Sequence, residues 1–241
     1  MPRTRTQATP RTAVVWAVLN AELARREDAG GGPVHVVDAG GGTGGFAVPL
    51  AETGHLVTVV DPSPDALAAL ARRAAEHGVA DRITAFQGDA DDLPSLVEPG
   101  TADIVLCHSV LEVVDDPART IGAVAAALRP GGCASVLVAN RAAAVLARAL
   151  AGHFTQALEG LVSDGTGPRR FDLEMLAALV TSAGLTPERA HGVRVVADLV
   201  PGTVVDVEPG AVEALVTLEL AMAEKPPYRD VATQLHVLAR R

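Results

Sequence analysis

Residues 36–45 have the sequence VVDAGGGTGG, in which a run of β-branched residues ends in an acid and a glycine-rich loop. An apolar run that is stopped by glycines predicts a strand buried on both faces. Gly40, Gly42 and Gly44 allow a tight turn and a close approach of a ligand to the backbone. The spacing also satisfies the G-x-G-x-x-G fingerprint of dinucleotide-binding proteins, so the segment predicts a ligand loop without naming the ligand.

Apolar runs and helical patterns alternate along most of the chain. The expected strands cover residues 34–40, 55–61, 82–89, 101–111, 133–140, 193–200 and 233–241. The expected helices cover residues 12–27, 44–54, 62–78, 116–132, 141–150, 171–184 and 208–225. Strands separated by helices of this length predict an α/β fold with a doubly wound, mostly parallel sheet and ligands at the carboxyl ends of its strands.

The chain has 241 residues, which is enough for a full hydrophobic core. We expect a single domain over 1–241, with an N-terminal helical extension over 1–30 and a lid-like insertion over 141–170. Within the insertion, 152–170 is expected to be a long loop, and such loops commonly bind ligands. No run of 18 apolar residues lacks charge, so we expect no membrane span.

Composition limits the possible partners. The formal net charge is -9 and only six residues are aromatic, which disfavours tRNA or other nucleic acid as a partner. Cys107 and Cys133 lie in apolar contexts without the spacing of a metal site. We therefore expect two buried, inert thiols, no metal and a cytoplasmic protein.

Acidic residues lie at the carboxyl ends of three of the expected strands. Asp38 precedes the first glycine, where an acid suits a cationic ligand, and Asp61 ends the second strand, where a carboxylate can accept both hydroxyls of a ribose. Asp89 or Asp91 could accept the amine of an adenine while the Ala90 N–H donates to its ring. With no Lys or Arg in the glycine loop, these acids describe a cationic nucleoside, S-adenosylmethionine (SAM); solvated strand ends are the alternative.

The order of these motifs resembles class I SAM-dependent methyltransferases. The motifs are D-x-G-x-G-x-G at 38–44, Asp61, GDA at 88–90 and LRPGG at 128–132. The resemblance implies a Rossmann-like sheet of seven strands whose last strand is antiparallel, with helices on both faces. Further segments resemble the tRNA 5-carboxymethoxyuridine methyltransferase branch, which makes a methyl ester on a wobble uridine; they are HSVLEVVDDP at 108–117, ALRPGG at 127–132, Asn140, GHF at 152–154, HGVRV at 191–195, PPYRD at 226–230 and LHVLAR at 235–240.

This resemblance also implies roles for individual residues. An arginine matching Arg11 holds the methionine carboxylate of the cofactor, and residues matching Gly40, Gly41, Asp61, Ala90, Asp91 and His108 line it. The whole expected cofactor set is Arg11, Asp38, Gly40, Gly41, Gly42, Gly44, Asp61, Pro62, Asp89, Ala90, Asp91 and His108. Where the branch carries aromatic residues and a basic run, this chain has Val114, Ala139, Ala197 and SDGTGP at 163–168. We therefore expect a small-molecule or modified-nucleoside substrate, with tRNA possible but disfavoured.

His108 is the candidate catalytic base for a hydroxyl or amine nucleophile, whereas a carboxylate nucleophile needs none. A satisfied buried histidine is the alternative. For the remaining candidates we favour structural roles: Glu112 as a helix cap, Arg169 and Arg170 as a solvated pair, and His236 as a core residue. A small-molecule O- or N-methyltransferase and a non-catalytic SAM-binding protein remain open. A nicotinamide oxidoreductase is disfavoured, because Tyr-x-x-x-Lys does not occur.

Overall fold

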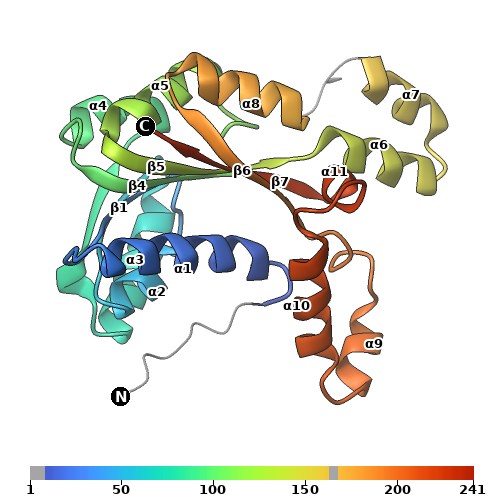
Figure 1. Ribbon diagram of the computed structural model, residues 1–241, viewed down its shortest axis with the longest axis horizontal. Coiled ribbons are helices and arrows are strands. Elements are labelled where there is room, and N and C mark those ends of the chain that lie inside the picture. Colours follow the sequence, from blue (N-terminus) through green and yellow to red (C-terminus); the bar gives the residue numbers. More distant parts are fainter. Residues whose placement is uncertain (1–8, 163–167) are drawn as a thin grey trace.

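The computed structural model describes residues 9–162 and 168–241, and a seven-stranded sheet crosses its centre (Figure 1). Its strands are β1 (His35–Ala39), β2 (Leu56–Asp61), β3 (Ile83–Gln87), β4 (Ala102–His108), β5 (Leu128–Ala139), β6 (Thr186–Val193) and β7 (Gln234–Arg240). The spatial order is β3-β2-β1-β4-β5-β7-β6. β1 to β5 pair in parallel, and β7 runs antiparallel to both β5 and β6. The predicted seven-stranded sheet with an antiparallel last strand is confirmed.

Helices cover both faces of this sheet. They are α1 (Ala13–Asp28), α2 (Ala47–Glu52), α3 (Pro64–Glu76), α4 (Leu93–Leu96), α5 (Pro117–Ala127), α6 (Arg141–Leu150), α7 (Phe154–Val162), α8 (Leu173–Ser182), α9 (Gly202–Val207), α10 (Ala211–Met222) and α11 (Tyr228–Val231). In Figure 1, α5 and α8 lie above the sheet, and α1, α2 and α3 lie below it. Among the described residues, none of these helices has the length and apolarity that a membrane crossing requires.

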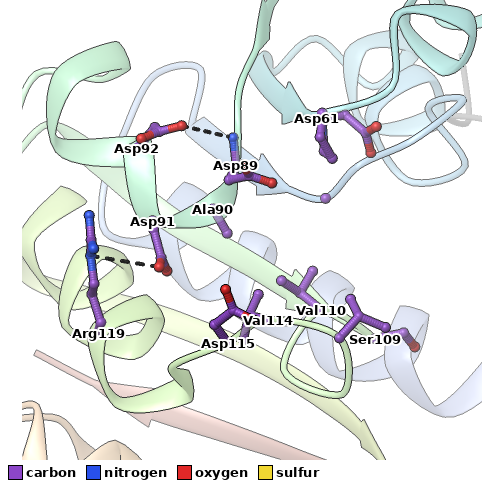
Figure 2. Close-up of a pocket in the computed structure, with 13 residues that line it drawn as sticks. Asp61, Asp89, Ala90, Asp91, Asp92, Ser109, Val110, Val114, Asp115 and Arg119 are labelled. Atoms are coloured by element: carbon purple, nitrogen blue, oxygen red, sulfur yellow. Dashed lines mark hydrogen bonds and ion pairs between the residues drawn. The ribbon is translucent and has the colours of Figure 1, made fainter. Parts of the chain in front are cut away.

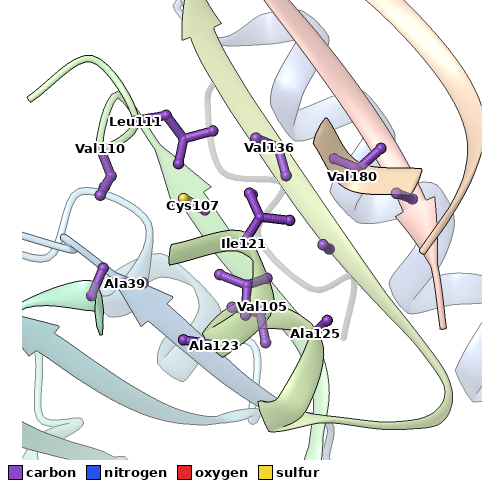
Figure 3. Close-up of a cluster of buried hydrophobic side chains, with 14 of the residues drawn as sticks. Ala39, Val105, Cys107, Val110, Leu111, Ile121, Ala123, Ala125, Val136 and Val180 are labelled. Carbon is purple, nitrogen blue, oxygen red and sulfur yellow. The ribbon is translucent and has the colours of Figure 1, made fainter. Parts of the chain in front are cut away.

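Two hydrophobic clusters hold the layers together, one on each face. Figure 3 shows the first, in which Ile121 of α5 and Val180 of α8 pack on the side chains of β4 and β5. In the second, Trp16 and Leu19 of α1 pack with β1, α2 and α3. Both cysteines are free and buried as expected, and burial raises the pKa of each thiol to about 12.

The helix starts follow the sequence signals. The Ser63 hydroxyl accepts the N–H of Ala66 at 3.2 Å, with Pro64 in the first turn of α3. The Asp116 carboxylate accepts the N–H groups of Ala118 and Arg119 at the start of α5. These caps fix where α3 and α5 leave the edge of the sheet at which the parallel strands end.

The prediction of a strand over 193–200 is wrong, because β6 ends at Val193. Arg194 has a positive φ of 59°, which turns the chain out of the sheet. The next three N–H groups, of Val195, Val196 and Ala197, donate at 2.9, 2.8 and 2.7 Å to the carboxylate of Glu219. That carboxylate lies on α10 and is fully buried. The Glu219 carboxylate satisfies the three N–H groups that a neighbouring strand would otherwise pair. A segment with the β-branched pattern of a strand therefore forms a turn here.

Glu219→Gln is expected to lower the free energy of unfolding by about 2–3 kcal/mol. A glutamine can still accept hydrogen bonds from two of the three N–H groups. Its NH₂ group faces the third, so two buried donors face each other without an acceptor. Urea denaturation measures the loss. Glu213→Gln, on the exposed side of the same helix, is the matched control. Equal stability of the two variants would show that the hydrogen bonds to Glu219 do not stabilise the turn.

The expected loop over 152–170 is also wrong in part, since α7 occupies 154–162 and forms a hairpin with α6. Residues 163–167 of the expected insertion, and 1–8 of the expected extension, lie outside the described residues. Apolar side chains recur every three or four positions along α7, which is the spacing of a helix. The glycine-containing segments on either side of it make the whole stretch resemble a loop in the sequence. Many apolar side chains of the hairpin are exposed: Leu146, Leu150, Phe154, Leu158, Leu161 and Val162.

Candidate active site

A cavity of about 510 Å³ opens where β1, β2 and β4 end (Figure 2). Six of the residues expected to bind a cofactor line it: Gly40, Asp61, Pro62, Asp89, Ala90 and Asp91. The other lining residues are Asp92, Ser109, Val110, Val113, Val114, Asp115 and Arg119. The carboxyl ends of successive parallel strands meet at this edge, so the topology brings together acids that are far apart in sequence.

Asp61 organises the glycine loop. One carboxylate oxygen accepts the N–H of Gly42 at 2.8 Å, and the other accepts the N–H of Ser63 at 2.9 Å. The carboxylate therefore ties the loop after β1 to the start of α3 while it lines the cavity. Each oxygen keeps a second lone pair, so the pair can also accept two hydroxyl groups of a ligand.

Two glycines of the loop are required by close contacts. Gly40 has φ +73°, and a Cβ there would lie 2.5 Å from Cγ2 of Val110 in the cavity wall. Gly44 has φ +79°, and its Cβ would lie 2.4 Å from Cδ1 of Leu70 on α3. Gly40 therefore shapes the cavity, whereas Gly44 allows α3 to pack against the loop.

Asp38 lies beneath the loop and not in the cavity lining. A Cβ on Gly41 would come within 2.6 Å of its Oδ2 atom, which is buried and has no hydrogen-bond partner among the described residues. Burial, with a smaller contribution from the charge of Asp61, raises the pKa of Asp38 to about 7. An uncompensated carboxylate beside a ligand cavity suits a positively charged ligand.

The acids after β3 divide into two roles. Asp91 accepts a hydrogen bond from the Thr120 hydroxyl and lies 3.6 Å from Arg119, so it anchors α5. Asp89 lines the cavity with an exposed side chain, and its backbone N–H donates to Asp92 at 3.1 Å. Of the two candidates for an adenine amine, Asp89 has the more exposed side chain, whereas Asp91 is held by Thr120 and Arg119.

Six expected cofactor residues lie outside the cavity lining: Asp38, Gly41, Gly42, Gly44, Arg11 and His108. Arg11 pairs with Asp198 at 2.9 Å. His108, at the end of β4, holds the Ser135 hydroxyl at 2.8 Å through Nε2 and packs edge-on against Phe46. Its Nδ1 atom is buried and has no partner among the described residues. Burial lowers the pKa of His108 to about 4, so the imidazole is neutral at pH 7.

Beside the cavity, the structure brings in side chains that the sequence did not indicate. Ser109 has a positive φ of 58°, and its hydroxyl accepts the amide N–H of Gln234 at 3.3 Å. Backbone strain of this kind is concentrated at functional sites. Gln234 is the first residue of β7, and only the antiparallel direction of that strand brings it to this edge.

The structural roles favoured for two charged residues need correction. Glu112 does not cap a helix: its Oε1 accepts the N–H of Ala139 at 2.7 Å, and burial raises its pKa. Arg169 is not merely a solvated surface residue: it is half-buried, and its guanidinium donates to the carbonyls of Val114 at 2.9 Å and Leu111 at 3.3 Å. Arg170 donates to nearby backbone carbonyls. Both Glu112 and Arg169 therefore fix the segment that follows β4.

Comparisons with known proteins show the family of the chain. Residues 36–132 match a family model described as a methyltransferase domain. The chain is 30% identical over 235 residues to the tRNA 5-carboxymethoxyuridine methyltransferase of Escherichia coli K12, covering 96% of this chain and 88% of that protein. It is 31% identical over 159 residues to a ubiquinone biosynthesis O-methyltransferase of Xanthomonas euvesicatoria, covering 65% of this chain and 64% of the relative.

The fold has matching solved structures as well. An S-adenosylmethionine-dependent methyltransferase from Mesorhizobium loti superposes with a TM-score of 0.63 at 22% identity, over 95% of this chain and 98% of that one. The acidic strand ends, the buried uncompensated Asp38 and the cradle at Gly40 fit a cationic adenosyl cofactor. With similarity to the E. coli enzyme along nearly its whole length, the chain belongs to the class I SAM-dependent methyltransferases and is an enzyme that uses S-adenosylmethionine.

Proposed function

We propose that this methyltransferase acts on a hydroxyl or amine group of a small molecule. The observation that carries the proposal is the charge of the cavity, which is lined by Asp61, Asp89, Asp91, Asp92 and Asp115 against the single cation Arg119. Such a lining favours a cationic cofactor and repels an anionic substrate. A carboxylate or a phosphate-rich chain would meet this repulsion, whereas a neutral metabolite would not.

The residues of the chain supply alignment and proton transfer. When bound, SAM supplies an electrophilic methyl group. Asp61 and Asp89 would hold the adenosine part of the cofactor. Asp38 would balance the positive charge of its sulfonium group. A hydroxyl or amine loses a proton when it is methylated, and Nδ1 of neutral His108 is a candidate acceptor at this edge of the sheet. Phe46 packs on the same imidazole ring and shields it from water.

The α6–α7 hairpin fits an apolar substrate and supports the expectation of a lid. It begins directly after β5, at the edge where the parallel strands end, and extends beyond the sheet (Figure 1). Leu150 is 83% exposed and Phe154 72% exposed, at the turn between the two helices. Exposed apolar side chains in such number are typical of a surface that binds an apolar partner. We propose that this hairpin covers the substrate during methyl transfer.

A second candidate is methyl-ester formation on 5-carboxymethoxyuridine in tRNA. The observation in its favour is the similarity to the E. coli enzyme, which extends over 96% of this chain. A carboxylate nucleophile needs no base, so it leaves His108 without a role in proton transfer.

A labelling experiment separates the two candidates. The purified protein is incubated with SAM that carries a tritiated methyl group, in parallel with a small-molecule extract of the source cells and with tRNA that lacks the ester. The proposal expects label in the small-molecule fraction and none in tRNA. Base-labile label in tRNA would overturn it and establish the ester. An Asp61→Ala variant controls for label that does not depend on SAM binding.

The raised pKa of Asp38 predicts that SAM affinity depends on pH. Below about pH 7 the carboxyl is protonated and neutral, and above it the carboxylate attracts the cationic cofactor. Affinity is therefore expected to rise between pH 6 and 8, with release of a proton on binding. Calorimetry in buffers of different ionisation enthalpy measures that proton. Asp38→Asn should flatten the profile, and an equally steep profile in that variant would assign the titration to another group.

A further inference from the structure

We propose that His108, Ser135, His236, His191 and Glu224 form a proton relay, which carries the proton of the substrate nucleophile from the active-site edge to the surface. The proposal rests on the proposed function, because only a hydroxyl or amine releases such a proton. Besides His108, it assigns positioning and transfer roles to Ser135, His236, His191 and Glu224, none of which lines the cavity.

The relay is a continuous hydrogen-bonded chain across four neighbouring strands. Nε2 of His108 lies 2.8 Å from the Ser135 hydroxyl, which lies 2.8 Å from Nε2 of His236. Nδ1 of His236 lies 3.2 Å from Nδ1 of His191, and Nε2 of His191 lies 3.2 Å from Oε1 of Glu224. The first four residues come from β4, β5, β7 and β6, which are adjacent in this order. In the pairing register, His236 lies directly opposite His191.

The relay has a buried interior and an exposed end. Ser135 and His236 are fully buried and His191 is 3% exposed, whereas the Glu224 side chain is 63% exposed. Burial lowers the pKa of each of the three histidines. Arg189 and Arg229 disfavour a positive charge on His191, while Glu224 opposes them. The three imidazole rings are therefore neutral at pH 7, and Glu224, the one acid of the relay, faces solvent.

Neutral rings and one carboxylate fix the direction of every hydrogen bond. Glu224 can only accept, so His191 donates from Nε2 and accepts at Nδ1. His236 then donates from Nδ1 and accepts at Nε2, so the Ser135 hydroxyl donates to His236. Ser135 must accept from Nε2 of His108. His108 is left with a bare lone pair on Nδ1, the atom that is buried without a partner among the described residues.

Each residue of the relay before Glu224 accepts one proton and passes one on. Nδ1 of His108 takes the proton from the nucleophile as the oxygen–methyl or nitrogen–methyl bond forms. The Nε2 proton of His108 moves to Ser135, whose own proton moves to Nε2 of His236. The Nδ1 proton of His236 moves to His191, and the Nε2 proton of His191 moves to Glu224. No ring keeps a positive charge, so the low pKa of each buried imidazole does not oppose transfer.

Imidazole ¹⁵N NMR of the full chain tests the arrangement without a substrate. The relay expects single tautomers, with the proton on Nε2 of His108, Nδ1 of His236 and Nε2 of His191. Ser135→Ala removes the link and should leave His108 as a mixture of tautomers. Glu213→Gln, on the helix before Glu224, should change nothing. A proton on Nδ1 of His108 in the unsubstituted protein, or an unchanged His108 in Ser135→Ala, would overturn the proposal.

A kinetic measurement tests proton transfer itself. With the small-molecule fraction as substrate, Ser135→Ala and Glu224→Gln should each lower the single-turnover rate at least tenfold, while the Kd for SAM stays unchanged. Glu224→Gln keeps an acceptor for His191 but removes the final proton site. Rates equal to that of Glu213→Gln would overturn the relay. Label found in tRNA with the expected tautomers would instead overturn the proposed function and leave the hydrogen-bonded chain established.

Discussion

Asp61→Ala is expected to weaken SAM binding by about one to two orders of magnitude, because hydrogen bonds to a charged group are each worth about 1.5–3 kcal/mol. The substitution removes an acceptor for the cofactor ribose and also releases the N–H groups of Gly42 and Ser63, which donate to this carboxylate at 2.8 and 2.9 Å. The glycine loop and the start of α3 then lose their common anchor. Isothermal titration calorimetry measures the change in Kd.

Two further variants make that result specific. Asp61→Asn keeps one acceptor but turns an NH₂ group toward one of the two N–H donors, so it should lose most of the affinity as well. Asp65→Ala, an exposed residue in the first turn of α3, is the control and should bind SAM as the unsubstituted protein does. If Asp61→Ala retained full affinity with an intact fold, the ribose assignment would be wrong.

Arg26→Ala is expected to lower the free energy of unfolding by about 3–5 kcal/mol, since it removes the buried guanidinium that the carboxylates of Glu22 and Asp103 share. The Arg26 guanidinium donates to Glu22 at 2.8 Å and to the Asp103 carboxylate at 3.0 Å. It also donates to the carbonyls of Asp103 and Gly131. The group joins α1 to the starts of β4 and β5, at the edge of the sheet opposite the cavity.

Urea denaturation of Arg26→Ala and of Arg25→Ala makes a matched comparison, because Arg25 also binds Glu22 but its side chain is 54% exposed. Arg25→Ala should cost less than about 1 kcal/mol. Hydrogen bonds from Arg25 and Arg240 outweigh burial and lower the pKa of Glu22 to about 2. Its stabilisation is therefore complete above pH 4.5 and is lost as the pH falls toward 2. A similar loss in both variants would contradict the role of the buried network.

The sequence predicts those parts of the fold that local patterns determine. The alternation of strands and helices, the caps at Ser63 and Asp116, and the acids that line the cavity all follow from neighbouring residues. The turn at 194–197 does not, because its acceptor, Glu219, is more than twenty positions away.

The site is predicted least well where it depends on strand order. β7 inserts between β5 and β6, and this placement aligns His108, Ser135, His236 and His191 and brings Gln234 to the cavity edge. Four polar residues on four separate strands give no signal in the sequence that their side chains will touch. His236 was expected to be a structural core residue, and its hydrogen-bond partners appear only when the strands are in register.

The packing of α1 makes the protein a fluorescent reporter of its own site. Trp16 is the only tryptophan in the chain. Its ring centroid lies 5.0 Å from that of Phe46, at the start of α2, and Phe46 lies 4.9 Å from His108. Emission at this one indole therefore reports on the environment of the glycine loop and of the imidazole, so ligand titrations can be followed without an attached dye.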